Sequence, residues 1–147
     1  YGLIHDIGIA VLDSCVPNIM DEIVKMQLEG FTQVAAERHV MEGLTHSDIG
    51  AWICDKWGLP TDIKNIVEFH HKPLLAKDNI IEVKLTHIGD IISTTYYEKL
   101  LGIELNNFFN KPILESLGAK EEDIQYIGNI LPIEVEKVYN LHIFNPQ

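Results

Sequence analysis

The sequence is poor in arginine and in basic residues generally. Among its 147 residues, Lys and Arg total 11 against 22 Asp and Glu, which gives a formal net charge of −11. Arg38 is its only arginine. Nucleic-acid-binding proteins carry a basic patch or stripe that neutralises phosphates. We therefore expect neither nucleic acid nor an anionic membrane surface as a partner.

Cysteines and long apolar runs are also scarce. Cys15 and Cys54 are the only cysteines, and they form no C-x-x-C pair. They cannot supply the disulfide framework of a small secreted domain. No apolar run reaches the roughly 20 residues of a membrane-spanning helix, and no basic segment precedes an apolar one as in a secretory signal. These absences favour a cytoplasmic protein, and the length suits one domain over residues 1–147.

Apolar residues recur at helical spacing along nearly the whole chain, which predicts an all-α fold of about seven to nine helices. No stretch alternates convincingly with a period of two, and no Asn-Gly or Asp-Gly hairpin turn occurs. The expected helices begin near Ile4 and then cover about 17–30, 31–42, 45–58, 60–71, 79–101, 111–118, 121–131 and 132–142. Pro132 is expected to separate the last two helices.

Histidines stand at apolar positions of two expected helices. Thr45 and Asp48 predict a capped helix start, after which His46 shares the apolar face with Trp57. The positive end of the helix dipole should keep His46 neutral and able to bind a metal. On the next helix, His70 lies on the apolar face, and its neighbour His71 points about 100° away around the helix axis.

The long helix at about 79–101 carries an aspartate between two apolar stripes. Ile81 and Leu85 belong to one stripe, and Val83 belongs to the side that also contains Asp90. This pattern predicts a helix in the middle of the bundle, where a carboxylate is costly unless it is paired or bound to a metal. His87, three residues before Asp90, could orient its carboxylate, but the pattern favours a core histidine that is hydrogen-bonded to a backbone carbonyl.

Six metal-competent side chains thus come from four expected helices: His5, Asp6, His46, His70, His71 and Asp90. Imidazole and carboxylate ligands suit Fe, Mn, Ni or Zn better than Ca or Mg. Taken singly, each group could equally be a hydrogen-bonded residue of the core. A polar network without a metal is therefore an alternative interpretation.

The order H-D…H…H-H…D resembles the HD superfamily of metal-dependent phosphohydrolases. A closer resemblance is to its HDOD branch, the HD-related output domains of bacterial signalling proteins. Three stretches carry this resemblance: GLIHDIGIAVL (2–12), GLTHSDIGAWICDKWGLPTDIKNIVEFHHKP (43–73) and LTHIGDIIS (85–93). The resemblance implies an orthogonal helical bundle of the HD-domain type. It also implies that a further helical part of the module would precede Tyr1.

The resemblance also implies roles for individual residues. His5, Asp6 and Asp90 would be metal ligands, and His46, His70 and His71 would be the additional ligands of two-metal members. In an active enzyme, Asp6 and His46 would be the catalytic residues. Two metal ions about 3.5–4 Å apart can activate a hydroxide and stabilise an in-line phosphate displacement, and Asp6 could bridge them.

Two departures separate this sequence from the enzymes that hydrolyse cyclic dinucleotides. The tandem histidines are followed by KPLLAKDNIIEV instead of a D-G-x-G-Y-P loop, and Ile9 replaces the lysine of H-D-I-G-K. These departures favour a regulatory signalling module whose partners are other signalling proteins or domains. A small phosphate ester is a further candidate ligand. A metal-dependent phosphohydrolase, acting on a phosphodiester or a nucleotide, is the alternative function.

Overall fold

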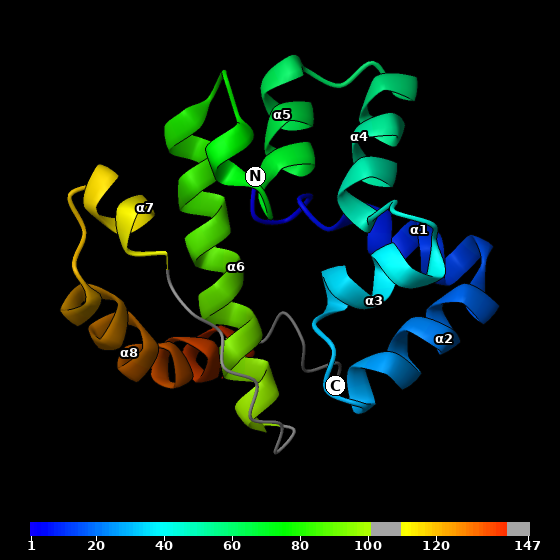
Figure 1. The fold of residues 1–147 in the computed structure, drawn as a ribbon. Helices are drawn as coiled ribbons and strands as arrows, with labels where there is room; N and C mark the ends of the chain where they lie inside the picture. The colour runs from blue at the N-terminus through cyan, green and yellow to red at the C-terminus, as the bar shows by residue number, and fades with distance from the viewer. Residues whose placement is uncertain (101–109, 141–147) are drawn as a thin grey trace. The chain divides into compact units, whose positions relative to one another are not determined.

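The computed structural model describes residues 1–100 and 110–140, and these two ranges contain helices and no strand. The elements in chain order are α1 (Ile7–Cys15), α2 (Pro17–Leu28), α3 (Gln33–Val40), α4 (His46–Lys56), α5 (Thr61–Phe69), the 3-10 turn η1 (Pro73–Leu75), α6 (Ile80–Leu100), α7 (Lys111–Ser116) and α8 (Glu121–Asn140) (Figure 1). The predicted all-α fold is confirmed. The expected end of the long helix, at Leu101 and Gly102, lies outside the described residues.

The chain divides into two compact units, Tyr1–Asp90 and Ile91–Gln147, and the boundary falls within α6. The first unit contains α1 to α5 and the beginning of α6, together with all six candidate ligands. The second unit contains the remainder of α6, α7 and α8. That residues 1–147 form a single domain stays a prediction.

Two glycines allow α1 and α4 of the first unit to cross closely. A Cβ on Gly8 would lie 2.0 Å from the carbonyl oxygen of His46 and 3.1 Å from the backbone nitrogen of Gly50, and a Cβ on Gly50 would lie 3.4 Å from the backbone nitrogen of Gly8. Only residues without a side chain permit this approach. The crossing therefore holds the segment before α1 against the first turn of α4.

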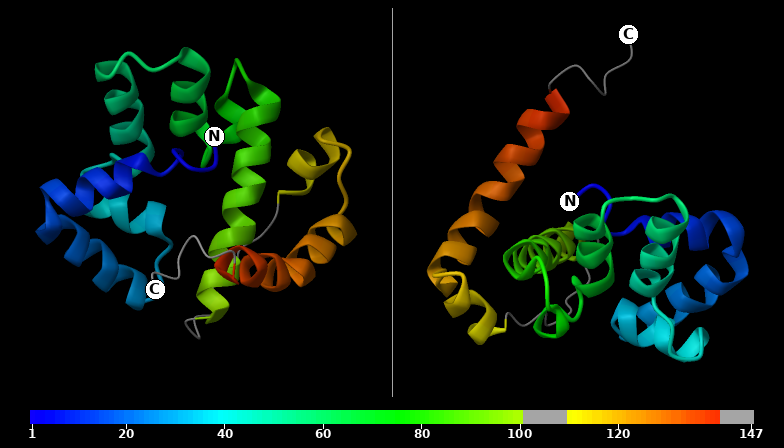
Figure 2. Two further views of the ribbon diagram at one scale, coloured as in Figure 1. Left: turned by 180° about the vertical axis from the view of Figure 1, so that it is seen from behind. Right: turned by 90° about the horizontal axis from the view of Figure 1, so that it is seen from above.

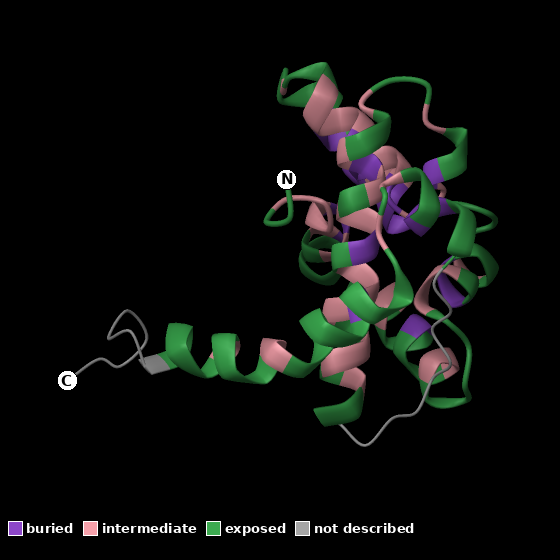
Figure 3. Ribbon diagram, turned by 90° about the vertical axis from the view of Figure 1, so that its left-hand side faces the viewer, coloured by how far each residue is buried: buried purple, intermediate pink, exposed green. Residues whose placement is uncertain are grey.

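Helices α4 and α5 pack side by side in every view (Figure 1, Figure 2). The predicted capping box at the start of α4 is confirmed, with Thr45 and Asp48 as its two members. Gly58 follows α4 in the left-handed region, at φ +64°, and Pro60 then leads into α5. The inner faces of these helices contribute much of the first unit's buried core: Ile53, Cys54, Ile66 and Val67. Buried positions are coloured purple in Figure 3.

The prediction that Trp57 belongs to the core is wrong. Its side chain is 62% exposed, because α4 ends at Lys56 and Trp57 is already the C-cap residue. Each of the two predicted apolar sides of α6 is buried only in part. Val83 on one side and Ile88 on the other are buried, whereas Ile80, Ile81 and Leu85 are exposed.

Helix boundaries also differ from expectation at three places that matter. Helix α1 begins only at Ile7, so the His5-Asp6 pair lies in the turn before it. Helix α5 ends at Phe69, so His70 is its C-cap residue and His71 lies in the turn that follows. Pro132 lies inside α8 instead of separating two helices. Proline removes one backbone hydrogen bond, and flanking helical residues can tolerate that loss in an exposed helix.

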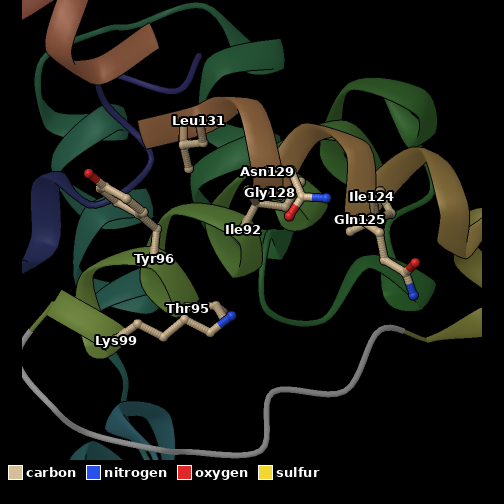
Figure 4. Close-up of a pocket in the computed structure, with 9 residues that line it drawn as sticks. All are labelled: Ile92, Thr95, Tyr96, Lys99, Ile124, Gln125, Gly128, Asn129 and Leu131. Atoms are coloured by element: carbon tan, nitrogen blue, oxygen red, sulfur yellow. The ribbon is translucent and has the colours of Figure 1, made fainter. Parts of the chain in front are cut away.

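The second unit contains an open groove of about 400 Å³ between α8 and the last turns of α6 (Figure 4). Apolar side chains from both helices line much of it, including Ile92, Ile124 and Leu131. Tyr96 and Lys99 lie on its α6 side. None of the helices in the described ranges is both long and apolar enough to cross a bilayer.

Candidate metal centre

The six predicted ligands come from four segments of the first unit: the turn before α1 (His5, Asp6), the first residue of α4 (His46), the C-cap and turn that follow α5 (His70, His71) and the middle of α6 (Asp90). The fold brings them into two overlapping groups, Asp6–His46–His70–His71 and His5–His70–Asp90. Within each group the ligand atoms all lie within 4.8 Å of one another. Their role as metal ligands stays a prediction.

Three imidazole nitrogens approach one another around Asp6. Nε2 of His46 lies 3.1 Å from Nε2 of His71 and 3.3 Å from Nε2 of His70. Oδ1 of Asp6 lies 3.3 Å from the His46 nitrogen and 3.4 Å from the His70 nitrogen. Four potential ligand atoms from three separate segments thus surround one small volume.

Hydrogen bonds to Nδ1 fix which nitrogen of each histidine faces this volume. Nδ1 of His5 donates to the carbonyl oxygen of Gly2 at 2.9 Å, and Nδ1 of His70 donates to that of Val67 at 2.8 Å. Nδ1 of His46 donates to a carboxylate, that of Glu37, at 2.7 Å. Because these acceptors require a proton on Nδ1, the Nε2 atom of each imidazole is the one available to a metal ion.

Two buried ligand atoms in the cluster have no hydrogen-bond partner, namely Nε2 of His5 and Oδ1 of Asp6. The His5 nitrogen is 3.2 Å from Oδ2 of Asp6 and 3.7 Å from Oδ1 of Asp90. Buried polar atoms are nearly always satisfied in folded proteins. A cation among these atoms would satisfy both, so the residues fit a divalent metal ion.

The electrostatics of the cluster favour positive charge. The neighbouring carboxylates of Asp6 and Asp90 raise the pKa of His5 to about 10. Burial lowers the pKa of His46, but Asp6 and Glu37 raise it more strongly, to about 9. Burial opposes ionisation of Asp6, yet its contacts with His46, His5 and His70 hold its pKa well below the usual value. A divalent ion can replace protons in such a site, because ligands must lose them to bind a metal.

The expectation that the helix dipole keeps His46 neutral is wrong for the protein without a metal. Two carboxylates, those of Asp6 and Glu37, face its imidazole and outweigh the partial charge of the helix end. His71 behaves in the opposite way, because burial and then repulsion from His70 and His46 lower its pKa to about 3.

The carboxylate of Asp90 is also held in its ionised form. Burial tends to raise its pKa, but the contact with His5 and the proximity of His71 lower it below the usual value. Nδ1 of His71 lies 3.6 Å from Oδ2 of Asp90. This carboxylate therefore faces the second group of ligands from α6.

His87 contacts the centre through the backbone. Its Nδ1–H donates to the carbonyl oxygen of His70 at 2.7 Å, which joins α6 to the C-terminal end of α5. Burial lowers the pKa of His87, so its imidazole is neutral near pH 7. The predicted role of His87 in orienting Asp90 stays a prediction.

Glu37 is a residue of this centre that the sequence did not single out. Its side chain is fully buried and contacts His46 directly. The available signal was spacing, since Glu37 lies three residues after Val34 and four before Met41, on the inward face of α3. The pattern around it, AAERHVME, reads as an ordinary amphipathic helix with a surface charge.

Comparison with known proteins supports the resemblance seen in the sequence. Residues 1–73 match the HDOD domain family. An uncharacterized protein from Treponema pallidum (strain Nichols) is 30% identical over 70 residues, which is 48% of this chain. The aligned region makes up 14% of that relative's length. No solved structure matches the chain.

The family match contains five of the six candidate ligands, and Asp90 follows it on α6. The match also includes Gly8 and Gly50, whose close approach places His46 beside the His5-Asp6 turn. Apart from α6, the segments that build the cluster therefore lie within the matched residues. Through its residues 1–73, this chain belongs to the HDOD domain family.

Proposed function

We propose that this chain is a regulatory module of a bacterial signalling protein, and that its His/Asp cluster binds a divalent transition-metal ion. One observation carries the proposal: Nε2 atoms of His46, His70 and His71 converge on Oδ1 of Asp6, which has no hydrogen-bond partner. Imidazole and carboxylate ligands select Mn, Fe, Ni or Zn in such a site. The ion would join α1, α4 and α5 and so stabilise the unit that other signalling proteins or domains contact.

We propose that this module acts in the bacterial cytoplasm. The family match and the relative from Treponema pallidum support a bacterial signalling context. Both cysteines, Cys15 and Cys54, are free thiols, as expected for a reducing compartment. The proposed partners are proteins rather than nucleic acids, because the chain carries a net charge of −11.

A thermal-shift titration tests metal binding. The chain is stripped with a chelator and titrated with Mn²⁺, Zn²⁺ or Ni²⁺. At 100 times Kd, binding stabilises a protein by about 2.7 kcal/mol, so we expect Tm to rise by roughly 5–10 °C for a chain of this size. Mg²⁺ and Ca²⁺ should have little effect, since they prefer oxygen ligands. A Tm that no transition metal raises would contradict the proposal.

A metal-dependent phosphohydrolase is the second candidate, and the position of Asp6 favours it. Its Oδ1 faces His46 and His70, whereas its Oδ2 faces His5. His70 has a single free nitrogen and can serve only one ion, because its Nδ1 is bound to Val67. Two ions would therefore be held by different subsets of these side chains, and Asp6 could contribute an oxygen to each subset. Such a pair of ions would supply an activated hydroxide and stabilise a phosphate displacement.

An assay with generic substrates distinguishes these functions. Under the regulatory proposal, the chain loaded with Mn²⁺ or Fe²⁺ releases no p-nitrophenolate from bis-p-nitrophenyl phosphate or p-nitrophenyl phosphate above the metal-only background. Ile9 gives the physical reason, because this aliphatic side chain, three residues after Asp6 in the sequence, cannot hydrogen-bond to a phosphate. Turnover that disappears in His5→Ala and Asp6→Ala variants would establish the enzyme instead.

A further inference from the structure

Glu37 occupies an unusual position for an acidic residue, since its side chain is fully buried in the first unit. A buried carboxylate is costly unless hydrogen bonds satisfy its oxygens. Here Oε1 accepts from Nε2 of Gln33 at 3.0 Å and from Nδ1 of His46 at 2.7 Å. Oε2 accepts from the backbone N–H of His46 at 2.9 Å. Both oxygens are thus used, and two of the three donors belong to one histidine.

The turn between α3 and α4 makes this contact possible. Glu42 and Gly43 both adopt positive φ values, 54° and 100°, and the N–H of Gly43 donates to the carbonyl oxygen of Arg38 at 2.8 Å. The chain therefore reverses sharply after α3 and returns His46 to the side chain of Glu37, nine residues earlier. The contact between Glu37 and His46 therefore depends on the tertiary fold, because the two residues lie on different helices.

We infer that Glu37 is a positioning residue for the metal ligand His46. This inference rests on the proposed metal site. By accepting the Nδ1 proton, Glu37 leaves Nε2 of His46 as the coordinating atom and directs it toward Asp6 and His70. Glu37 also accepts the backbone N–H of His46, so the same carboxylate restrains both the imidazole ring and the main chain of this residue. A carboxylate bound to a ligating histidine also makes the imidazole a stronger donor to the metal.

The capping residue Asp48 supplies a matched control at the same helix end. Asp48 accepts the backbone N–H of Thr45 at 2.9 Å, as Glu37 accepts that of His46. Asp48 also bonds to the Thr45 hydroxyl and to Lys72, but it is not within either ligand group. The two carboxylates therefore share a role at the start of α4, and Glu37 alone also contacts a candidate ligand.

The experiment compares the affinity of Zn²⁺ for the full chain and for the variants Glu37→Gln and Asp48→Asn. We expect Glu37→Gln to weaken binding about 10–100-fold, the range observed when such supporting partners are removed. Asp48→Asn should lower Tm, because it removes the ion pair with Lys72, while leaving the Zn²⁺ affinity within about twofold, because Asp48 belongs to neither ligand group. Equal affinities in the wild type and Glu37→Gln would overturn the inference. Absence of Zn²⁺ binding in the wild type would instead remove the metal site on which it rests.

A second measurement needs no variant. In the wild-type protein loaded with Zn²⁺, a strong hydrogen bond from His46 to Glu37 should give a slowly exchanging, strongly deshielded Nδ1 proton in the NMR spectrum. A His46 imidazole that binds Zn²⁺ through Nδ1, or that shows no such proton, would overturn the role of Glu37 even if Glu37→Gln fails to fold.

Discussion

Replacing Asp6 with asparagine is expected to weaken metal binding by this chain severely. Asp6 faces His5, His46 and His70 together, at distances between 3.2 and 3.4 Å. Asparagine preserves the size of the side chain but removes the negative charge that offsets the ion. The loss of a ligand should exceed the roughly 10–100-fold effect of losing an outer partner, so we expect Kd for Zn²⁺ or Mn²⁺ to rise by more than about 100-fold.

Asp13→Asn provides the control for this experiment. Asp13 is exposed on α1, near Asp6 in sequence and outside both ligand groups. The same change of charge there should leave the affinity unaltered in an isothermal titration. If Asp6→Asn bound metal as tightly as Asp13→Asn, the ion would have to occupy some other place on the chain.

Replacing Gly8 with alanine is expected to cause the largest loss of stability of any single methyl addition in the first unit. The new Cβ would stand 2.0 Å from the backbone oxygen of His46, and a backbone atom cannot rotate away as a side chain can. Overpacking usually costs about 1–3 kcal/mol, and we expect a cost at the upper end of that range. Separation of α1 from α4 should also weaken metal binding, because it moves His46 away from Asp6.

Urea denaturation measures this effect, with Gly128→Ala as the matched control. Gly128 lies in α8, where an added Cβ meets nothing within 4 Å. Alanine is a better helix former than glycine by about 1 kcal/mol, so the control variant should gain stability where Gly8→Ala loses it. A Gly8→Ala variant as stable as the wild type would show that α1 and α4 do not cross at this glycine.

The sequence predicted the type of fold because helical periodicity and helix caps are local signals. The box at Thr45 and Asp48 was found from spacing alone, and the structure contains it. Boundaries were less predictable. Trp57 follows the apolar period of α4, yet the chain leaves the helix one residue earlier and exposes that side chain. Pro132 is a helix breaker by its chemistry, and only the three-dimensional structure shows that α8 continues through it.

The candidate site was predictable where it depended on residue type and family pattern. His5, Asp6 and the tandem His70-His71 are metal-competent groups in apolar surroundings, and the structure brings them together. Glu37 was not predictable in this way, because a glutamate on an amphipathic helix usually faces solvent. Its contact with His46 depends on the turn at Glu42 and Gly43, a tertiary feature that no local pattern encodes.

The pKa of His46 also depends on tertiary contacts that the local sequence does not encode. The helix end alone predicts a neutral imidazole. The two carboxylates that raise its pKa to about 9 come from α3 and from the turn before α1. Interactions between segments therefore decide the charge of the cluster, and they make it a better site for a cation than the sequence indicates.

A crystal structure of the chain loaded with Mn²⁺ or Zn²⁺, with anomalous data collected at the absorption edge of the metal, tests the central claim most directly. The account predicts a strong anomalous peak between Asp6, His46 and His70, with ligand distances of about 2.0–2.2 Å and Nε2 as the coordinating nitrogen of both imidazoles. No peak in this volume, under conditions in which the crystals contain the metal, would contradict the account and leave the cluster as a hydrogen-bonded polar core.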